Sequence, residues 1–126
     1  KSGVTPEILV EMLERRLDNV VFRLGLAPTR NASRQLVSHG HILVNGRKVN
    51  SPSFSVKAGD AIDIKESSKT KKVFADTRTI LKKFQTPKWL EIDKEKLSSK
   101  VIGLPDKEIT SSIPVNVSKV LEFYSR

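Results

Sequence analysis

Hydrophobic residues between positions 5 and 24 recur at the spacing of an amphipathic helix. At about 100° per residue they share one sector roughly 120° wide. These apolar positions are Leu9, Leu13, Leu17, Val20, Val21 and Leu24. The positions on the opposite side are Arg15, Arg16, Asn19 and Arg23. The pattern therefore predicts one helix that buries its apolar face and presents its basic face to an anionic surface.

Capping residues predict where this helix and the next one begin and end. Thr5 suits a helix start, and Gly25 suits a left-handed cap at the end. Thr29 can cap a second helix over 30–39, which Gly40 ends. An apolar side again opposes a basic side in this second helix, so the two helices are expected to share one basic surface.

The strongest local signal in the chain is that of a β-hairpin. Asn45 and Gly46 fit a type I′ turn, because both central residues of that turn need positive φ. In the resulting register Leu43 lies opposite Lys48. Arg47 and Lys48 then place positive charge at the exposed tip of the hairpin.

Further strands are predicted after the hairpin. Apolar residues alternate at Phe54 and Val56 and at Ile62 and Ile64, with a turn at 59–60 between them. Two helices followed by several short antiparallel strands form a compact module. The predicted fold class is therefore α+β, with a two-helix plus small antiparallel-sheet module and flanking helical segments.

The last part of the chain alternates between predicted helices and strands. A polar, basic connection at 66–72 leads into a helix over 73–84. Two short strands and a terminal helix follow, at 87–93, at 100–105 and from Pro114 onward. Trp89 is expected to be a packing residue of the core. The terminal helix is expected to need another surface on which to pack.

Charge narrows the class of partner. A chain of 126 residues suits one domain with an ordinary core. The 23 Lys and Arg residues against 14 Asp and Glu give a net charge of +9, which favours a nucleic acid or an acidic membrane surface. No run approaches the roughly 18 to 20 apolar residues of a membrane span, and no signal peptide is recognised, so a soluble, non-secreted protein is expected. The first residue is lysine, so the chain is predicted to begin inside a longer product or after processing.

The sequence contains few residues that could form a catalytic or metal-binding site. The absence of cysteine excludes disulfides and thiolate sites. His39 and His41 flank Gly40 without the spacing of a helical metal pair, so no metal and no cofactor are expected. Each histidine is left with two interpretations, a hydrogen bond to RNA or a plain role in the turn.

One short motif resembles a catalytic one. Arg16-Leu17-Asp18 resembles the catalytic tripeptide of pseudouridine synthases. It lies within a strong helical period, so Asp18 is predicted to be an acid on the helix surface. No nucleophile, base and orienting group can be combined from these residues, and neither an enzyme nor a small-molecule substrate is expected.

Binding of structured RNA is the chemistry that remains. The start of the second helix offers free amide groups beside Arg30, where a phosphate can sit. Exposed aromatic residues are too few for a base-stacking platform, so recognition by shape and backbone is expected. The basic residues expected to contact phosphates are Arg15, Arg16, Arg23, Arg30, Arg34, Arg47 and Lys48.

Several stretches resemble a known family. RLDNVVFRLG, TRNASRQLVSHGHILVNGRKVN and VKAGDAIDI closely resemble the RNA-binding module named after the fourth protein of the small ribosomal subunit. That module also occurs in pseudouridine synthases, some tyrosyl-tRNA synthetases and a heat-shock ribosome-binding protein. PKWLEID and VLEFYSR resemble the ribosomal family itself, and the likeness covers nearly the whole chain from Glu7.

The resemblance implies a structural protein of the small ribosomal subunit, in a bacterium or an organelle. It implies recognition of a multi-helix junction in the 5′ domain of small-subunit rRNA, nucleation of the assembly of the subunit body, and an influence on translational accuracy. It also implies contact with ribosomal protein five and with mRNA near its entrance. The RNA contacts that it implies are Arg15, Arg16, Asn19, Thr29, Arg30, Ser33, Arg34, His39, Gly40, His41, Asn45, Gly46, Arg47 and Lys48.

The resemblance also suggests how the chain is divided. Residues 1–14 would be what remains of an N-terminal helical domain, 15–104 the RNA-binding module, and 105–126 a C-terminal segment and helix that packs on the helical domain. Family members normally carry an additional N-terminal portion, with a zinc-binding cysteine cluster in some. Two alternatives stay open, an RNA-modifying or ribosome-rescue factor with the same module, and a protein that binds DNA or a membrane surface.

Overall fold

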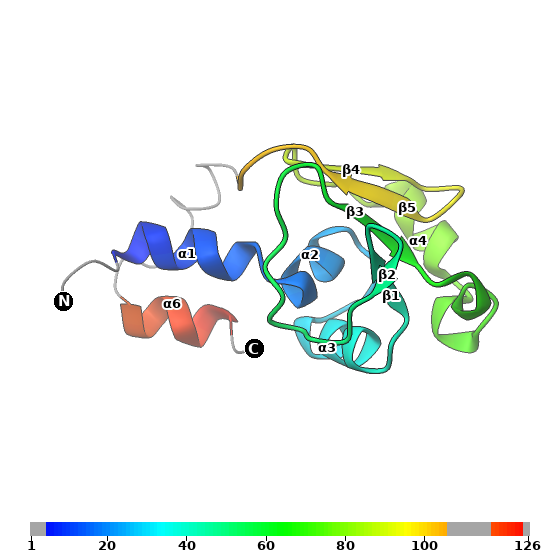
Figure 1. Cartoon of the computed structure of the whole chain (residues 1–126), viewed down its shortest axis with the longest axis horizontal. Coiled ribbons are helices and arrows are strands. Elements are labelled where there is room, and N and C mark those ends of the chain that lie inside the picture. Colours follow the sequence, from blue (N-terminus) through cyan, green and yellow to red (C-terminus); the bar gives the residue numbers. More distant parts are fainter. Residues whose placement is uncertain (1–4, 106–116, 125–126) are drawn as a thin grey trace.

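The computed structural model describes residues 5–105 and 117–124 (Figure 1). The helices are α1 (Pro6–Glu14), α2 (Leu17–Arg23), α3 (Arg30–Ser38), α4 (Thr77–Lys83) and α6 (Val117–Tyr124). Two 3₁₀ turns are η1 (Glu66–Ser68) and η2 (Lys72–Phe74). The strands are β1 (Ile42–Val44), β2 (Arg47–Lys48), β3 (Ala61–Ile64), β4 (Leu90–Asp93) and β5 (Ser98–Val101). The predicted α+β class is confirmed.

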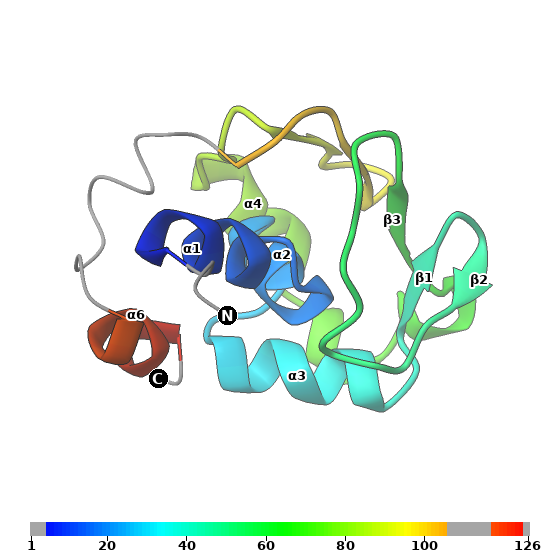
Figure 2. The same ribbon diagram turned by 60° about the vertical axis from the view of Figure 1, so that its left-hand side comes forward.

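The strands form one antiparallel sheet, in the order β2-β1-β3-β5-β4. Helices α2 and α3 pack against each other and share a core with this sheet. Helix α6 lies beside α1, at the end of the molecule away from the sheet (Figures 1 and 2). The two ends of the described chain therefore meet next to α2 and α3.

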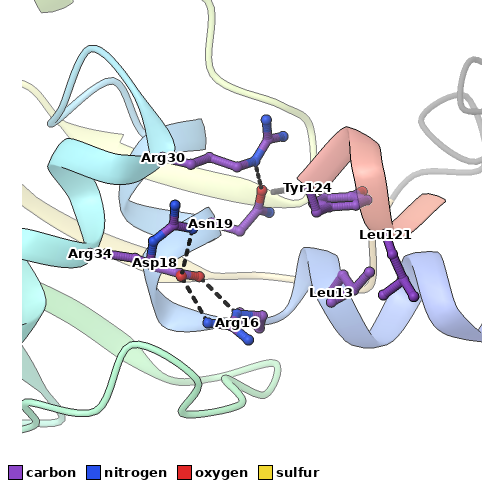
Figure 3. A pocket seen from close by; sticks show the side chains of 8 residues that line it. All are labelled: Leu13, Arg16, Asp18, Asn19, Arg30, Arg34, Leu121 and Tyr124. Carbon is purple, nitrogen blue, oxygen red and sulfur yellow. Dashed lines mark hydrogen bonds and ion pairs between the residues drawn. The ribbon is translucent and has the colours of Figure 1, made fainter. Parts of the chain in front are cut away.

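The prediction of one continuous helix over 5–24 is wrong. The backbone at Arg16 is extended, with φ −65° and ψ 142°, and it forms an isolated β-bridge with Ser55. The N–H of Leu17 donates to the carbonyl oxygen of Phe54 at 2.8 Å. Hydrogen bonds to a distant segment replace helical ones here, so α1 and α2 are separate helices. Figure 3 shows the turn of chain between them, which carries the Arg16 side chain.

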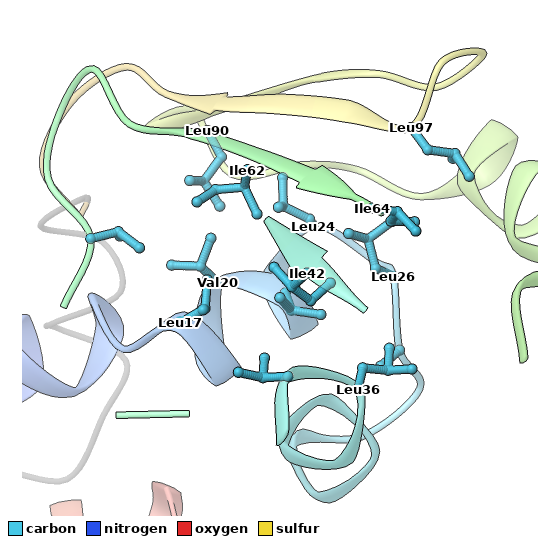
Figure 4. Close-up of a cluster of buried hydrophobic side chains, with 14 of the residues drawn as sticks. Leu17, Val20, Leu24, Leu26, Leu36, Ile42, Ile62, Ile64, Leu90 and Leu97 are labelled. Carbon is cyan, nitrogen blue, oxygen red and sulfur yellow. The ribbon is translucent and has the colours of Figure 1, made fainter. Parts of the chain in front are cut away.

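The apolar stripe of the first segment is divided between two clusters because of this break. Its members in α2, together with Leu24, are buried in the main core with the sheet (Figure 4). Those in α1 pack instead against α6, where the buried residues are Val10, Val120 and Tyr124. The apolar residues of the predicted stripe are therefore packed against two different partners, the sheet and α6.

The predicted hairpin and helix cap are confirmed. Asn45 and Gly46 have φ values of 52° and 81°, as a type I′ turn requires, and Leu43 pairs with Lys48. Gly25 has φ +83° just after α2, which is the expected left-handed cap.

Several boundaries in the rest of the chain differ from the prediction. The 54–56 segment makes only the isolated bridge and is not a strand. The helix expected over 73–84 begins at Thr77 after η2, and Ile80 faces solvent. The strand expected from Lys100 begins at Ser98. Trp89 is buried in the main core, as predicted.

The C-terminal helix is found as expected, packed on α1. Its predicted opening at Pro114 lies outside the described residues. The division of the chain at 14/15 and 104/105 stays a prediction. Within the described residues, no helix is long and apolar enough to cross a bilayer.

Candidate nucleic-acid interface

Helices α1, α2, α3 and α6 surround a pocket of about 230 Å³ (Figure 3). One wall is polar and carries three guanidinium groups, and the other wall is apolar. The polar wall consists of Arg16, Asp18, Asn19, Arg30 and Arg34. The apolar wall consists of Leu13, Leu121 and the ring of Tyr124.

Asp18 lies beneath two of the guanidinium groups. Its carboxylate accepts Nε and Nη2 of Arg16 at 3.1 and 3.0 Å, and Nη1 of Arg34 lies 3.8 Å away. The prediction that Asp18 is a surface acid is wrong, because its side chain is buried. A buried carboxylate needs such partners, and here it fixes the position of both cations. One negative charge among three positive ones leaves the pocket cationic.

The expected basic face of the first helix is partly turned inward. Asn19 is buried, and Arg23 pairs with the buried carboxylate of Glu14 at 2.7 Å. Burial alone lowers the pKa of Arg23, but hydrogen bonds and attraction to Glu14 outweigh it and raise that pKa. The prediction that Asn19 and Arg23 lie together on an exposed face is therefore wrong.

Arg15 is tied to the neighbouring loop rather than to the pocket. Its Nε donates to the carbonyl oxygen of Val56 at 3.0 Å, and Nη1 lies 3.5 Å from Glu11. The side chain is half-buried.

The start of α3 is capped as predicted. The Thr29 hydroxyl accepts the N–H of Ala32 at 3.0 Å. Arg30 follows at once, and its Nε donates to the side-chain oxygen of Asn19 at 3.0 Å. Ser33 is buried one turn later. The two helices are thus joined by a polar contact as well as by their apolar sides.

The hairpin tip forms a second cationic feature. Gly46, Arg47 and Lys48 are exposed. The side chain of Asn45 is occupied within the fold, since its amide donates to Asp60 at 3.0 Å and its oxygen accepts the N–H of Ala61 at 2.8 Å. These bonds fix the tip to the turn before β3, so the hairpin presents its charge on a rigid support.

The two histidines differ in their surroundings. His39 is exposed at the end of α3. His41 is half-buried, lies 2.7 Å from the Ser68 hydroxyl through Nδ1, and meets the ring of Phe74 edge-on. Burial, and then the nearby His39, lower the pKa of His41. Gly40, between them, lies under the Lys48 side chain, which connects the end of α3 to the hairpin.

The structure thus sorts the predicted site residues into three groups. Arg16, Arg30 and Arg34 meet at the pocket, while Arg47 and Lys48 meet at the hairpin tip. Asn19 and Ser33 are buried, and Arg23 is half-buried against Glu14. Among the described residues, no three His, Cys, Asp or Glu side chains are grouped to hold a metal ion.

Sequence reasoning missed Tyr124, which lines the pocket, and Glu14, to which the Tyr124 hydroxyl donates. Glu14 is buried, and it accepts hydrogen bonds from Asn19, Arg23 and Tyr124. Helical spacing within the first segment gave no signal for this, because one of the partners lies 110 positions away in sequence.

Comparisons with known proteins extend this description. A family model described as the S4 domain matches residues 15–62. The chain is 51% identical over 124 residues to small ribosomal subunit protein uS4 of Persephonella marina. It is 49% identical over 124 residues to the protein of that name from a Sulfurihydrogenibium species, and 47% identical over 123 residues to that of Aquifex aeolicus.

These three alignments cover 98%, 98% and 97% of this chain, and 60%, 60% and 58% of the relatives. The chain therefore spans about 60% of the length of the curated relatives it matches. The matched S4 domain contains the polar wall of the pocket and the hairpin tip. On these matches the chain is similar over nearly its whole length to part of the small ribosomal subunit proteins uS4, and its residues 15–62 match the S4 domain.

Proposed function

We propose that this chain is the RNA-binding part of a structural protein of the small ribosomal subunit, not an enzyme. It would bind small-subunit rRNA in a bacterium or an organelle. The relatives carry the name of a small-subunit protein, and the matched domain is the S4 domain. The net charge of +9 suits a polyanionic partner.

The observation that carries the proposal is the cationic pocket. Arg16, Arg30 and Arg34 line it, and Arg16 and Arg34 pair with the carboxylate of Asp18. Guanidinium groups bind phosphate oxygens through paired hydrogen bonds, and the start of α3 adds amide groups beside Arg30. An RNA phosphate lying in this pocket would meet an excess of positive charge held at fixed positions.

The hairpin tip would supply a second contact. Arg47 and Lys48 are exposed on a turn that Asn45 fixes to the fold. A pocket and a separate rigid tip can contact phosphates only in an RNA whose backbone passes both sites. This requirement suits recognition of a junction between helices by its shape. The sequence resemblance supports a multi-helix junction in the 5′ domain as the target, with nucleation of the subunit body as the consequence.

The remaining parts of the proposal rest on the resemblance alone. They are contact with ribosomal protein five, proximity to mRNA at its entrance, and an influence on translational accuracy. In this proposal Arg15, Thr29, His39, Gly40 and His41 flank the contact surface. Asn19, Arg23 and Ser33 would act from beneath it.

The test is the affinity of the chain for a transcript of the junction from the 5′ domain, beside an unrelated folded RNA of equal length. Both are titrated across a salt series. Arg34→Ala is expected to weaken junction binding by about tenfold and to reduce the salt slope by about one contact. Lys100→Ala removes one charge from β5, far from α3, and should change neither (Figure 1).

Equal affinity for the two RNAs would contradict recognition of the junction. An Arg34→Ala variant that binds as well as Lys100→Ala would contradict the pocket as the contact site. Unfolding of each variant, followed by Trp89 fluorescence, separates a loss of contact from a loss of structure.

A further inference from the structure

The beginning and the end of the described chain meet at one buried carboxylate. Oε1 of Glu14 accepts Nδ2 of Asn19 at 2.9 Å and Nε of Arg23 at 3.2 Å. Oε2 accepts Nη2 of Arg23 at 2.7 Å and also the hydroxyl of Tyr124 on α6. A fully buried carboxylate would be costly without these donors, so α6 supplies part of what makes the site stable.

Asn19 connects this carboxylate to the pocket. Its Nδ2 donates both to the Glu14 side chain and to the Glu14 backbone oxygen, at 2.9 and 2.8 Å. The amide group is planar, so its oxygen points the other way, where it accepts Nε of Arg30 at 3.0 Å. Figure 3 shows this contact between Asn19 and Arg30. Because Glu14 orients the Asn19 amide, it helps to determine where the Arg30 guanidinium is held.

Arg30 is also enclosed by aromatic rings. Its Cζ atom lies 4.6 Å from the ring centre of Phe22, 4.9 Å from that of Tyr124 and 5.2 Å from that of Phe123. Two of these three rings belong to α6. Cation–π contacts of this kind stabilise a partly desolvated guanidinium. The docked terminal helix thus holds Arg30 from one side, and Asn19 holds it from another.

One nitrogen of the Arg30 guanidinium makes no hydrogen bond with the described residues. Nη2 of Arg30 is buried, and it has no hydrogen-bond partner among the described residues. Arg30 itself lines the pocket. A buried, unpaired donor of a cation is costly, and an anionic oxygen entering the pocket would satisfy it.

We propose that Glu14 and Tyr124 are positioning residues through which the C-terminal helix α6 sets Arg30 for RNA binding. This inference rests on the function proposed above and adds a role for α6 to it. Docking of α6 fixes the rings of Phe123 and Tyr124 and the hydrogen bonds from Glu14 through Asn19 to Arg30. The Arg30 guanidinium is therefore in place before RNA binds. Undocking of α6 would leave the charge present but mobile, which lowers affinity without changing net charge.

The test is a double-mutant cycle on the full chain, with the 5′-domain junction transcript as the probe. Tyr124→Phe keeps the ring and removes the hydroxyl, so it is expected to weaken binding by roughly fivefold with an unchanged salt slope. Arg30→Ala should weaken binding more and lower the slope by about one. Tyr124→Phe in the Arg30→Ala background should then cause no further loss, because the residue that it positions is gone.

Ser118→Ala is the matched control. It also removes one hydroxyl from α6, but Ser118 is exposed and does not line the pocket. It is expected to leave affinity unchanged. Phe123→Leu removes one of the two rings of α6. It should weaken binding in the parent chain but not in the Arg30→Ala background, so the test does not depend on Tyr124 alone.

The outcomes separate the two proposals. Equal losses from Tyr124→Phe with and without Arg30 would overturn the positioning role while leaving RNA binding at the pocket intact. An Arg30→Ala variant that binds like the parent chain would overturn the role of the pocket itself. Every affinity is measured where Trp89 fluorescence shows the variant to be folded.

Discussion

Leu17 tests the division of the apolar stripe between two cores most directly. It is the first residue of α2 and is fully buried (Figure 4). Leu17→Ala removes three carbon atoms, which at about 0.8 kcal/mol per buried methylene costs roughly 2.4 kcal/mol. A residual cavity of about 40 to 80 Å³, at about 24 cal/mol per Å³, adds roughly 1 to 2 kcal/mol.

The expected loss lies in the upper part of this range because the site cannot collapse easily. The backbone N–H groups of Leu17 and Asp18 donate to the carbonyl oxygens of Phe54 and Pro52 at 2.8 and 3.1 Å. These bonds fix the start of α2 against the neighbouring loop. The predicted decrease in the free energy of unfolding is about 4 kcal/mol.

The assay is urea unfolding followed by the fluorescence of Trp89, the single tryptophan, which lies in the same core. Leu104→Ala makes the same chemical change at a side chain that is 60% exposed, and should alter stability by less than about 0.5 kcal/mol. If the two variants lost equal stability, Leu17 would not be part of a well-packed core. A change in the slope of the unfolding free energy against urea concentration would show that the main core and the α1–α6 cluster unfold separately.

Two other predictions concern single residues. Burial, and then the negative charge of Glu14, raise the pKa of Tyr124 above its ordinary value against the opposing effect of Arg23 and Arg30. The folded protein therefore holds this proton more tightly than the unfolded chain, so its contribution to stability is complete below about pH 10 and is lost as the pH rises beyond that. Because Tyr124 is the single tyrosine, phenolate absorbance reports it alone, and ordinary titration near pH 10 in the folded chain would contradict the buried site. Gly25→Ala should destabilise the fold by more than about 1 kcal/mol, because φ is +83° and a Cβ would lie 2.8 Å from the Phe84 ring. Gly46→Ala, with φ +81° and open space around it, is the control in thermal unfolding, and equal losses would refute the role of the close approach.

The sequence by itself determined the local elements and the type of partner. The Asn45–Gly46 turn and the cap at Gly25 depend on φ preferences that belong to the residues themselves, so pattern was enough to place them. The apolar stripes were also readable, since burial follows from the period of the side chains. The excess of basic residues indicated a polyanion because charge is a property of composition.

Tertiary structure alone decided how the basic residues are used. Arg16 leaves the helical conformation because its backbone pairs with Ser55, a partner that no local period reveals. That break turns Asn19 and Arg23 inward toward Glu14 and leaves Arg16 at the pocket.

The contact between Glu14 and Tyr124 joins positions 110 residues apart. Helical periodicity relates only residues within a few turns, so it cannot report such a pair. The sequence thus supplied a basic, two-helix module with a hairpin. The packing of α1 against α6 determined which guanidinium groups are enclosed, which are paired and which remain exposed.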